Sequence, residues 1–183
     1  KHITFKSMTR KREHTVKHVL SEKTGLYVAG IVLSALIILT TTGVLSTSAD
    51  TTEVTLIDNE TEQAVIEAER AVSPGEKYTG LSKYDTLANG SGMIFIHDTE
   101  QTQTYVMRNM NFSIDMVFIN NDCTITAIHS ADKPAPNENG EEQHHRYSGL
   151  AKYILEVPEG YATKHVTKGD AVTIENTNCS TLT

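Results

Sequence analysis

The segment TYVMRNMNFSIDMVFINNDCTITAIH, residues 104–129, contains three apolar runs rich in β-branched and aromatic residues. A polar Arg-Asn-Met-Asn cluster at residues 108–111 separates the first two runs, and Asn-Asn-Asp at residues 120–122 separates the last two. Asn and Asp favour tight turns because they tolerate positive φ and hydrogen-bond their own backbone. We therefore expect a β-meander with one polar kink. The polar residues expected in or beside that kink are Arg108, Asn109 and Asp115.

Short apolar segments bounded by turn signals continue on both sides of this stretch. The further expected strands cover residues 53–57, 63–72, 93–96, 102–107, 151–157 and 171–174. Ser73-Pro74-Gly75-Glu76 has the form of a capping box with Pro at the first helical position, which predicts a short helix to about Leu81. The pattern predicts a mainly β fold, one small antiparallel sandwich or barrel with one or two short helices, preceded by a single transmembrane helix.

Charge is distributed unevenly along the chain. Through Gly25 there are seven Lys or Arg residues against two acids, whereas after Ser46 there are nine basic residues against twenty-one acids, a net charge of 9 − 21 = −12. Phosphate backbones repel so acidic a domain, which argues against a nucleic-acid partner.

Residues 25–45 form an uninterrupted segment without a charged side chain. As a helix this segment would span roughly 30 Å, the thickness of the hydrocarbon core of a bilayer. The positive-inside rule then keeps the basic leader, residues 1–24, in the cytoplasm. We expect a single-pass protein of the cell membrane with its main domain outside.

Three further segments follow the expected membrane span. Residues 46–52 read as a polar tether, residues 53–175 as the exported β domain and residues 176–183 as a flexible tail. A cleavable signal peptide is the alternative to a permanent anchor, because Thr47-Ser48-Ala49 offers a small-residue cleavage site.

Six short strings together resemble the domain of unknown function family numbered 192. The strings are Tyr78-Thr79-Gly80-Leu81-Ser82, Gly92-Met93-Ile94-Phe95, Tyr105-Val106-Met107-Arg108-Asn109-Met110, Ile114-Asp115-Met116-Val117-Phe118-Ile119, Tyr153-Ile154-Leu155-Glu156-Val157 and Gly169-Asp170. The resemblance covers about residues 53–175 and looks most like the membrane-anchored version in salt-loving archaea. It implies a compact, mostly β domain and no mechanism. Cys123 departs from the family pattern, which commonly has Gly in that hairpin.

Arg108, Asn109 and Asp115 form the best candidate ligand site in the sequence. The guanidinium could bind a small anion or carbonyl group, with Asn109 hydrogen-bonding the ligand and Asp115 orienting the arginine. The alternative is a purely structural network at the kink. We expect Tyr147 and Lys152 to line the same end of the sheet.

His129, His144 and His145, with Glu141 and Glu142, invite a metal interpretation. However, adjacent histidines on an extended chain point in opposite directions, and zinc requires three or four well-aimed ligands. We therefore expect no metal and no cofactor.

Two covalent modifications remain open from the sequence. Cys123 and Cys179 are the only cysteines, and they either form a disulfide or remain two free thiols. Asn59 and Asn89 lie in turn-like N-glycosylation sequences of the part expected outside the cell.

The leading functional hypothesis is an anchored extracytoplasmic domain that binds a small ligand or an envelope partner without catalysis. The alternative is a hydrolase or envelope-modifying enzyme that uses Arg108, Asn109 and Asp115. The expected partners are the membrane, through residues 25–45, and a small molecule or an envelope component, with no nucleic acid.

Overall fold

The computed structural model describes residues 50–180. The leader, the expected membrane span at residues 25–45 and most of the tether lie outside the described residues, as do the last three residues of the tail. Within the described part of the chain, no helix is both long enough and apolar enough to cross a membrane.

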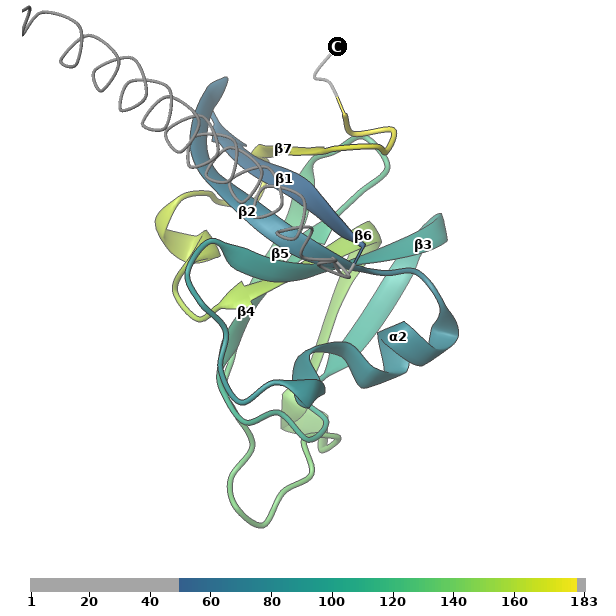
Figure 1. The fold of residues 1–183 in the computed structure, drawn as a ribbon, viewed down its shortest axis with the longest axis vertical. Helices are drawn as coiled ribbons and strands as arrows, with labels where there is room; N and C mark the ends of the chain where they lie inside the picture. Colours follow the sequence, from purple (N-terminus) through teal and green to yellow (C-terminus); the bar gives the residue numbers. More distant parts are fainter. Residues whose placement is uncertain (1–49, 181–183) are drawn as a thin grey trace, which may run out of the picture. The chain divides into compact units, whose positions relative to one another are not determined.

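One seven-stranded sheet dominates the domain, which confirms the mainly β prediction (Figure 1). The strands are β1 (Thr51–Asp58), β2 (Thr61–Ala71), β3 (Ser91–Val106), β4 (Ile114–Ile119), β5 (Ile125–Ala131), β6 (Arg146–Pro158) and β7 (Ala171–Ile174). One short helix, α2 (Pro74–Thr79), and the 3-10 turns η1 (Gly80–Lys83), η2 (Gln143–His145) and η3 (Ala162–Lys164) complete the described elements.

The sheet curls into a half-barrel with the strand order β5-β4-β6-β3-β2-β1-β7. Its two edge strands approach each other, because Thr124, just before β5, forms a β-bridge with Ala171 of β7. Cys123 and Cys179 are joined by a disulfide beside this bridge, with their Cα atoms 5.5 Å apart. The bridge and the disulfide fasten the ends of the half-barrel to each other.

The prediction of a purely antiparallel sheet is wrong at one place. β2 and β3 pair in parallel, whereas every other named strand pair is antiparallel. A parallel pair requires a crossover connection, and α2 with η1 supplies it. The predicted capping box starts that crossover: Ser73 Oγ accepts from the Glu76 N–H, and the Glu76 carboxylate accepts from the Ser73 N–H.

The expected β-meander is correct only in its second half. β4 and β5 form the predicted hairpin, but β6 lies between β3 and β4 and pairs with both. The connection at residues 107–113 bonds to a distant loop, because the Met107 and Asn109 N–H groups donate to the carbonyls of Gly140 and Asn139, both at 3.0 Å. Those backbone groups therefore have partners other than a neighbouring strand, and no hairpin forms.

The turn between β4 and β5 uses its residues differently from the prediction. Asn120 Oδ1 accepts from the N–H groups of Asp122 and Thr124, as an Asn in a turn should. The positive φ of this turn, 63°, falls on Cys123. A glycine would adopt this conformation without strain.

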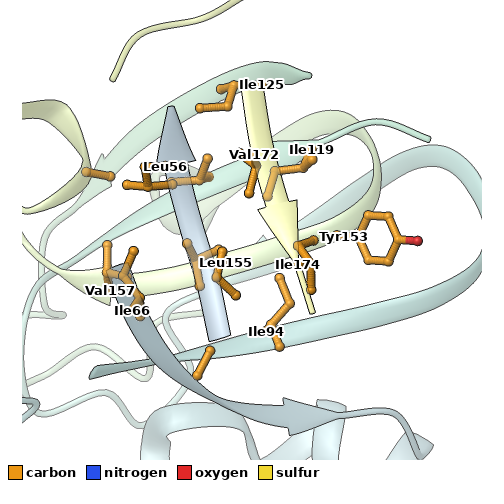
Figure 2. Close-up of a cluster of buried hydrophobic side chains, with 14 of the residues drawn as sticks. Leu56, Ile66, Ile94, Ile119, Ile125, Tyr153, Leu155, Val157, Val172 and Ile174 are labelled. Atoms are coloured by element: carbon orange, nitrogen blue, oxygen red, sulfur yellow. The ribbon is translucent and has the colours of Figure 1, made fainter. Parts of the chain in front are cut away.

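The sheet buries apolar side chains on both faces. We call the cluster inside the half-barrel the inner core, and all seven strands contribute to it. Figure 2 labels ten residues of this cluster, and every strand contributes at least one of them. They are Leu56, Ile66, Ile94, Ile119, Ile125, Tyr153, Leu155, Val157, Val172 and Ile174. The opposite face, the outer core, includes Phe95, Met116, Phe118 and Ile154, together with Leu81 of η1. Because side chains alternate along a strand, neighbours such as Ile154 and Leu155 belong to different cores.

Candidate functional site

A cavity of about 360 Å³ opens on the outer face of the sheet. Its walls come from α2 and η1 on one side and from β3 and β6 on the other, with Met110 and Ile114 completing the apolar lining. This volume lies at the small end of the range for small-molecule sites. The cavity is therefore large enough to hold a small ligand.

Glu156 is the most unusual residue in the cavity wall. It lies in β6, directly between Met93 of β3 and Met116 of β4, and only 4% of its surface is exposed. No hydrogen-bond donor within residues 50–180 reaches its carboxyl group. Burial raises the pKa of Glu156 to about 8, because a charged carboxylate is poorly solvated there. Glu156 is consequently protonated at neutral pH and can donate a hydrogen bond.

Gln103 is a second buried polar residue without a partner. It lies on β3 opposite Gly149 of β6, is 8% exposed and lines the same cavity. Its Nε2 atom is buried, and the described part of the chain offers it no acceptor. A buried amide without a partner destabilises a protein by about 1–3 kcal/mol. A ligand could supply the missing hydrogen bond.

Tyr105 and His97 form a hydrogen-bonded pair in the cavity wall. His97 Nε2 lies 3.0 Å from the Tyr105 hydroxyl, and Phe95 packs edge-to-face on Tyr105 with 4.9 Å between ring centroids. Burial is the main cause that raises the pKa of Tyr105 above its usual range, and the nearby Glu156 is the second cause. Burial, followed by Lys77, lowers the pKa of His97. Both side chains are therefore neutral near pH 7.

Two basic side chains also line the cavity. Lys77 projects from α2, and no carboxylate in the described residues lies within 4.0 Å of its Nζ atom. Arg108 follows β3, and its guanidinium carbon lies 4.3 Å from the ring centroid of Tyr78 on α2. Glu141 forms an ion pair with Arg108 Nε. The arginine is thereby fixed between the helix and the loop before η2.

The comparisons with known proteins identify the fold. The profile of DUF192, described as an uncharacterized ACR family, matches residues 55–174. The chain belongs to the DUF192 family. This result agrees with the resemblance in the sequence strings, although it does not distinguish a membrane-anchored or an archaeal version. No curated protein matches the chain.

Two crystal structures are similar to the DUF192 domain. A candidate transcription regulator from Sinorhizobium meliloti 1021 has a TM-score of 0.61 and 25% sequence identity, over 70% of this chain and 97% of that one. A protein of unknown function from Novosphingobium aromaticivorans DSM 12444 has a TM-score of 0.59 and 24% identity, over 70% of this chain and 88% of that one. The second comparison shows the shared fold alone.

The DUF192 domain does not group the sequence-predicted residues around one site. Arg108 lines the cavity, whereas Asn109 is exposed in the connection after it, with a φ of 54°. Asp115 is fully buried on the other face of β4, where its carboxylate accepts from Ser130 Oγ and from the N–H and hydroxyl of Thr163. No hydrogen bond or ion pair in residues 50–180 joins Arg108 to Asp115.

The other two predicted ligand residues also lie outside the cavity lining. Tyr147 faces Tyr105 across the β3–β6 pair and packs on the outer core. Lys152 hydrogen-bonds Asn121 Oδ1 at 3.4 Å, and its Nζ lies 5.5 Å from the ring centroid of Tyr153. Both residues have structural partners of their own.

A second polar cluster forms in the loop before β6. Glu138 Oε1 and Oε2 each lie 3.1 Å from a ring nitrogen, of His144 and His145 respectively. The expectation that adjacent histidines diverge is wrong here, because both belong to the η2 turn and their ring centroids are 4.2 Å apart.

This cluster offers three potential metal ligands within 4.8 Å of one another. Glu138 also accepts from the Ala135 N–H at 3.0 Å. The hydrogen bond from the Ala135 N–H is the main cause that lowers the pKa of Glu138, and the hydrogen bond with His145 is the second cause. The Glu138 carboxylate already has backbone and imidazole partners. We therefore interpret the cluster as a set of contacts that stabilises this loop.

The positions considered for glycosylation are accessible. Asn59 and Asn89 are both exposed in turns, at the β1–β2 hairpin and just before β3. Both side chains therefore meet the geometric requirement for modification.

The sequence reasoning did not find Glu156, Gln103, Tyr105, His97 or Lys77. The available signal was Glu156, a lone acid inside the apolar run YILEV at residues 153–157. A charged residue in a strand that is apolar on both faces is rarely fully buried unless it is paired. The position of Glu156 could have been found by that rule, but the residues around it come from three separate elements.

Proposed function

We propose that the DUF192 domain captures a small molecule in the outer-face cavity and releases it unchanged. One observation carries this proposal: Gln103 Nε2 is buried in the cavity wall without a hydrogen-bond partner in residues 50–180, and Glu156, 4% exposed, lines the same cavity. Native proteins rarely leave such groups unpaired. A ligand that hydrogen-bonds them would recover part of their desolvation cost, and this recovery favours binding.

We further propose that residues 25–45 anchor this domain in the cell membrane, with residues 1–24 in the cytoplasm. The apolar run and the basic leader support the anchor. The Cys123–Cys179 disulfide supports an oxidising compartment for the domain. Protease added outside intact cells should then digest residues 50–180, and protection of this region until the cells are lysed would contradict the placement.

Binding is preferred to catalysis because the Ser82 hydroxyl in the cavity wall donates to the Thr79 carbonyl, and no hydrogen bond in residues 50–180 joins it to His97. The only two cysteines are bonded to each other, and His97 is engaged with Tyr105. The enzyme alternative with Arg108, Asn109 and Asp115 has little support, since the Asp115 carboxylate is occupied by Ser130 and Thr163. A small ligand is also preferred to an envelope protein, because the site is a concave cavity of about 360 Å³.

The proposal can be tested by blocking the cavity. Thr79 lies at the end of α2, is exposed and lines the cavity. We expect Thr79→Trp to remove small molecules that co-purify with the full chain of 183 residues, as identified by mass spectrometry after denaturation. Thr61→Trp is the control, because Thr61 is an exposed threonine at the start of β2, outside the cavity.

The same pair of variants should be compared in a thermal-shift screen of metabolites and glycans. A compound that stabilises the parent chain and Thr61→Trp, but not Thr79→Trp, would support capture in the cavity. If every co-purified or stabilising compound acts equally on both variants, the cavity is not the binding site and the proposal fails.

A further inference from the structure

We propose that the cavity selects small organic carboxylates with a short apolar body. This inference rests on the proposed binding function and names the class of ligand. It follows from three features of the cavity, namely its charge, its unpaired hydrogen-bonding groups and its apolar wall.

The charged groups around the cavity favour an anion. Lys77 and Arg108 line the site, and Glu156 is the only carboxyl group among the lining residues. Glu156 is neutral at pH 7 because burial raises its pKa to about 8. Glu141 pairs with Arg108, so the uncompensated charge in the lining is the Lys77 ammonium, whereas residues 47–183 have a net charge of −12 (nine basic and twenty-one acidic residues). A small anion would meet an attractive site on a generally repulsive surface.

The unpaired polar groups favour a ligand with hydrogen-bond acceptors. Protonated Glu156 and the Gln103 side-chain NH₂ group can each donate to one oxygen of a carboxylate. Lys77 supplies a third donor with a full charge. Hydrogen bonds that involve an ionised partner are about twice as strong as neutral ones. A carboxylate would thus pair with the buried Gln103 amide, which has no partner in residues 50–180, and with the Glu156 carboxyl that lines the same cavity.

The rest of the lining favours an apolar body of limited size. Leu81, Phe95, Met110 and Ile114 line the cavity beside these donors. Its volume of about 360 Å³ admits a ligand of a few carbon atoms beyond the carboxylate. Burial of that body against the four side chains would strengthen binding with each CH₂ group removed from water.

Other ligand classes fit this arrangement less well. A primary ammonium would lie near Lys77 and Arg108, and it would need Glu156 to lose its proton. A phosphate dianion would place two charges beside the apolar wall, where Lys77 is the lining cation without an ion pair to residues 50–180 and Arg108 is paired with Glu141. The matched test is therefore hexanoate against hexanamide, hexylamine and inorganic phosphate.

The experiment measures binding of these four probes to the full chain in lipid nanodiscs by ligand-detected NMR, with empty nanodiscs as the baseline. We expect hexanoate to bind at least tenfold more tightly than the other three. Lys77→Gln should weaken hexanoate binding about tenfold, whereas Lys168→Gln, which removes the same charge from an exposed turn outside the cavity, should leave it unchanged.

Two substitutions of Glu156 separate its hydrogen-bonding role from its charge. Glu156→Gln keeps a neutral donor and should change hexanoate binding less than threefold. Glu156→Met removes the donor and should weaken binding about tenfold, while circular dichroism verifies that the domain remains folded.

The outcomes distinguish the ligand class from the binding function. Preferential binding of hexylamine, abolished by Glu156→Gln, would overturn the carboxylate inference but leave the cavity as a binding site. Preferential binding of phosphate, or hexanoate binding that is insensitive to Lys77→Gln and Glu156→Met, would also overturn it. If none of the probes binds, the carboxylate inference fails, and the Thr79→Trp comparison then decides the binding function separately.

Discussion

Two buried carboxyl groups on neighbouring strands have opposite surroundings. Asp115 of β4 points to the inner-core side and has three hydrogen-bond donors from Ser130 and Thr163. Glu156 of β6 points to the outer side, between two methionines, and has no donor in the described residues. The carboxylate on the inner side has hydrogen-bond donors from the protein, whereas the carboxyl group on the outer side lines the cavity. This contrast is the basis for proposing that one face of the sheet serves mainly stability and the other serves binding.

The largest expected effect concerns the pH dependence that Glu156 imposes on stability. Its pKa in the folded state is about 8, above the ordinary value of 4.5, so the folded state binds more protons than the unfolded state between these pH values. The free energy of unfolding should therefore fall as pH rises from 4.5 to 8, by at most about 5 kcal/mol from this group.

Urea unfolding of the parent chain and of Glu156→Gln at pH 5 and pH 8 would measure this contribution. The variant should lose less stability than the parent chain on raising the pH, by a few kcal/mol. Equal losses would mean that Glu156 is solvated, and the contrast with Asp115 would then disappear.

The second effect concerns the closure of the half-barrel beside the inner core. Cys123 and Cys179 are separated by 56 positions, so opening the disulfide increases the entropy of the unfolded chain. Replacement of both cysteines by alanine should lower the free energy of unfolding by about 4 kcal/mol. Chemical denaturation would measure this loss in the free energy of unfolding. The affinity for hexanoate should be preserved at temperatures where the variant is folded.

The third effect tests the satisfied carboxylate itself. Asp115→Ala leaves the Thr163 N–H and the Ser130 hydroxyl without their acceptor, and should destabilise the domain by about 3 kcal/mol. Asp115→Asn, which keeps one acceptor oxygen, should cost less. Neither substitution should change the affinity for hexanoate if the two faces have separate roles.

The smallest effect concerns the helix that forms one wall of the cavity. Ser73→Ala removes the side-chain acceptor for the Glu76 N–H in the capping box and should cost about 1 kcal/mol. Hydrogen exchange should accelerate in α2 but not in the inner-core strands. Uniform acceleration in both regions would show that the two faces unfold as one unit.

The local features of this fold could be read from the sequence. Ser73 and Glu76 predict the start of α2, and Asn120 predicts the β4–β5 turn, because capping boxes and Asx turns depend on residues a few positions apart. The apolar run 171–174 likewise corresponds to β7 at both ends. These signals are contained within single segments of the chain.

The long-range features could not be read in the same way. β6 inserts between β3 and β4, and nothing in residues 104–119 distinguishes this order from a meander. Arg108 was identified as a candidate, but its partner Glu141 lies 33 positions later. The burial and the raised pKa of Glu156 could not be predicted, because they depend on strands and a helix that lie far apart in the sequence.

The position of β6 between β4 and β3 also constrains how the chain can fold during synthesis. Strands β1 to β3 can pair among themselves, and so can β4 with β5, but no described pairing joins these two groups before residues 146–158 are made. Until then β3 and β4 each have an unpaired edge, which other chains could bind. A ribosome-stalled fragment that ends before Arg146 should therefore aggregate, and release of β6 should convert two separate pieces into one cooperative unit.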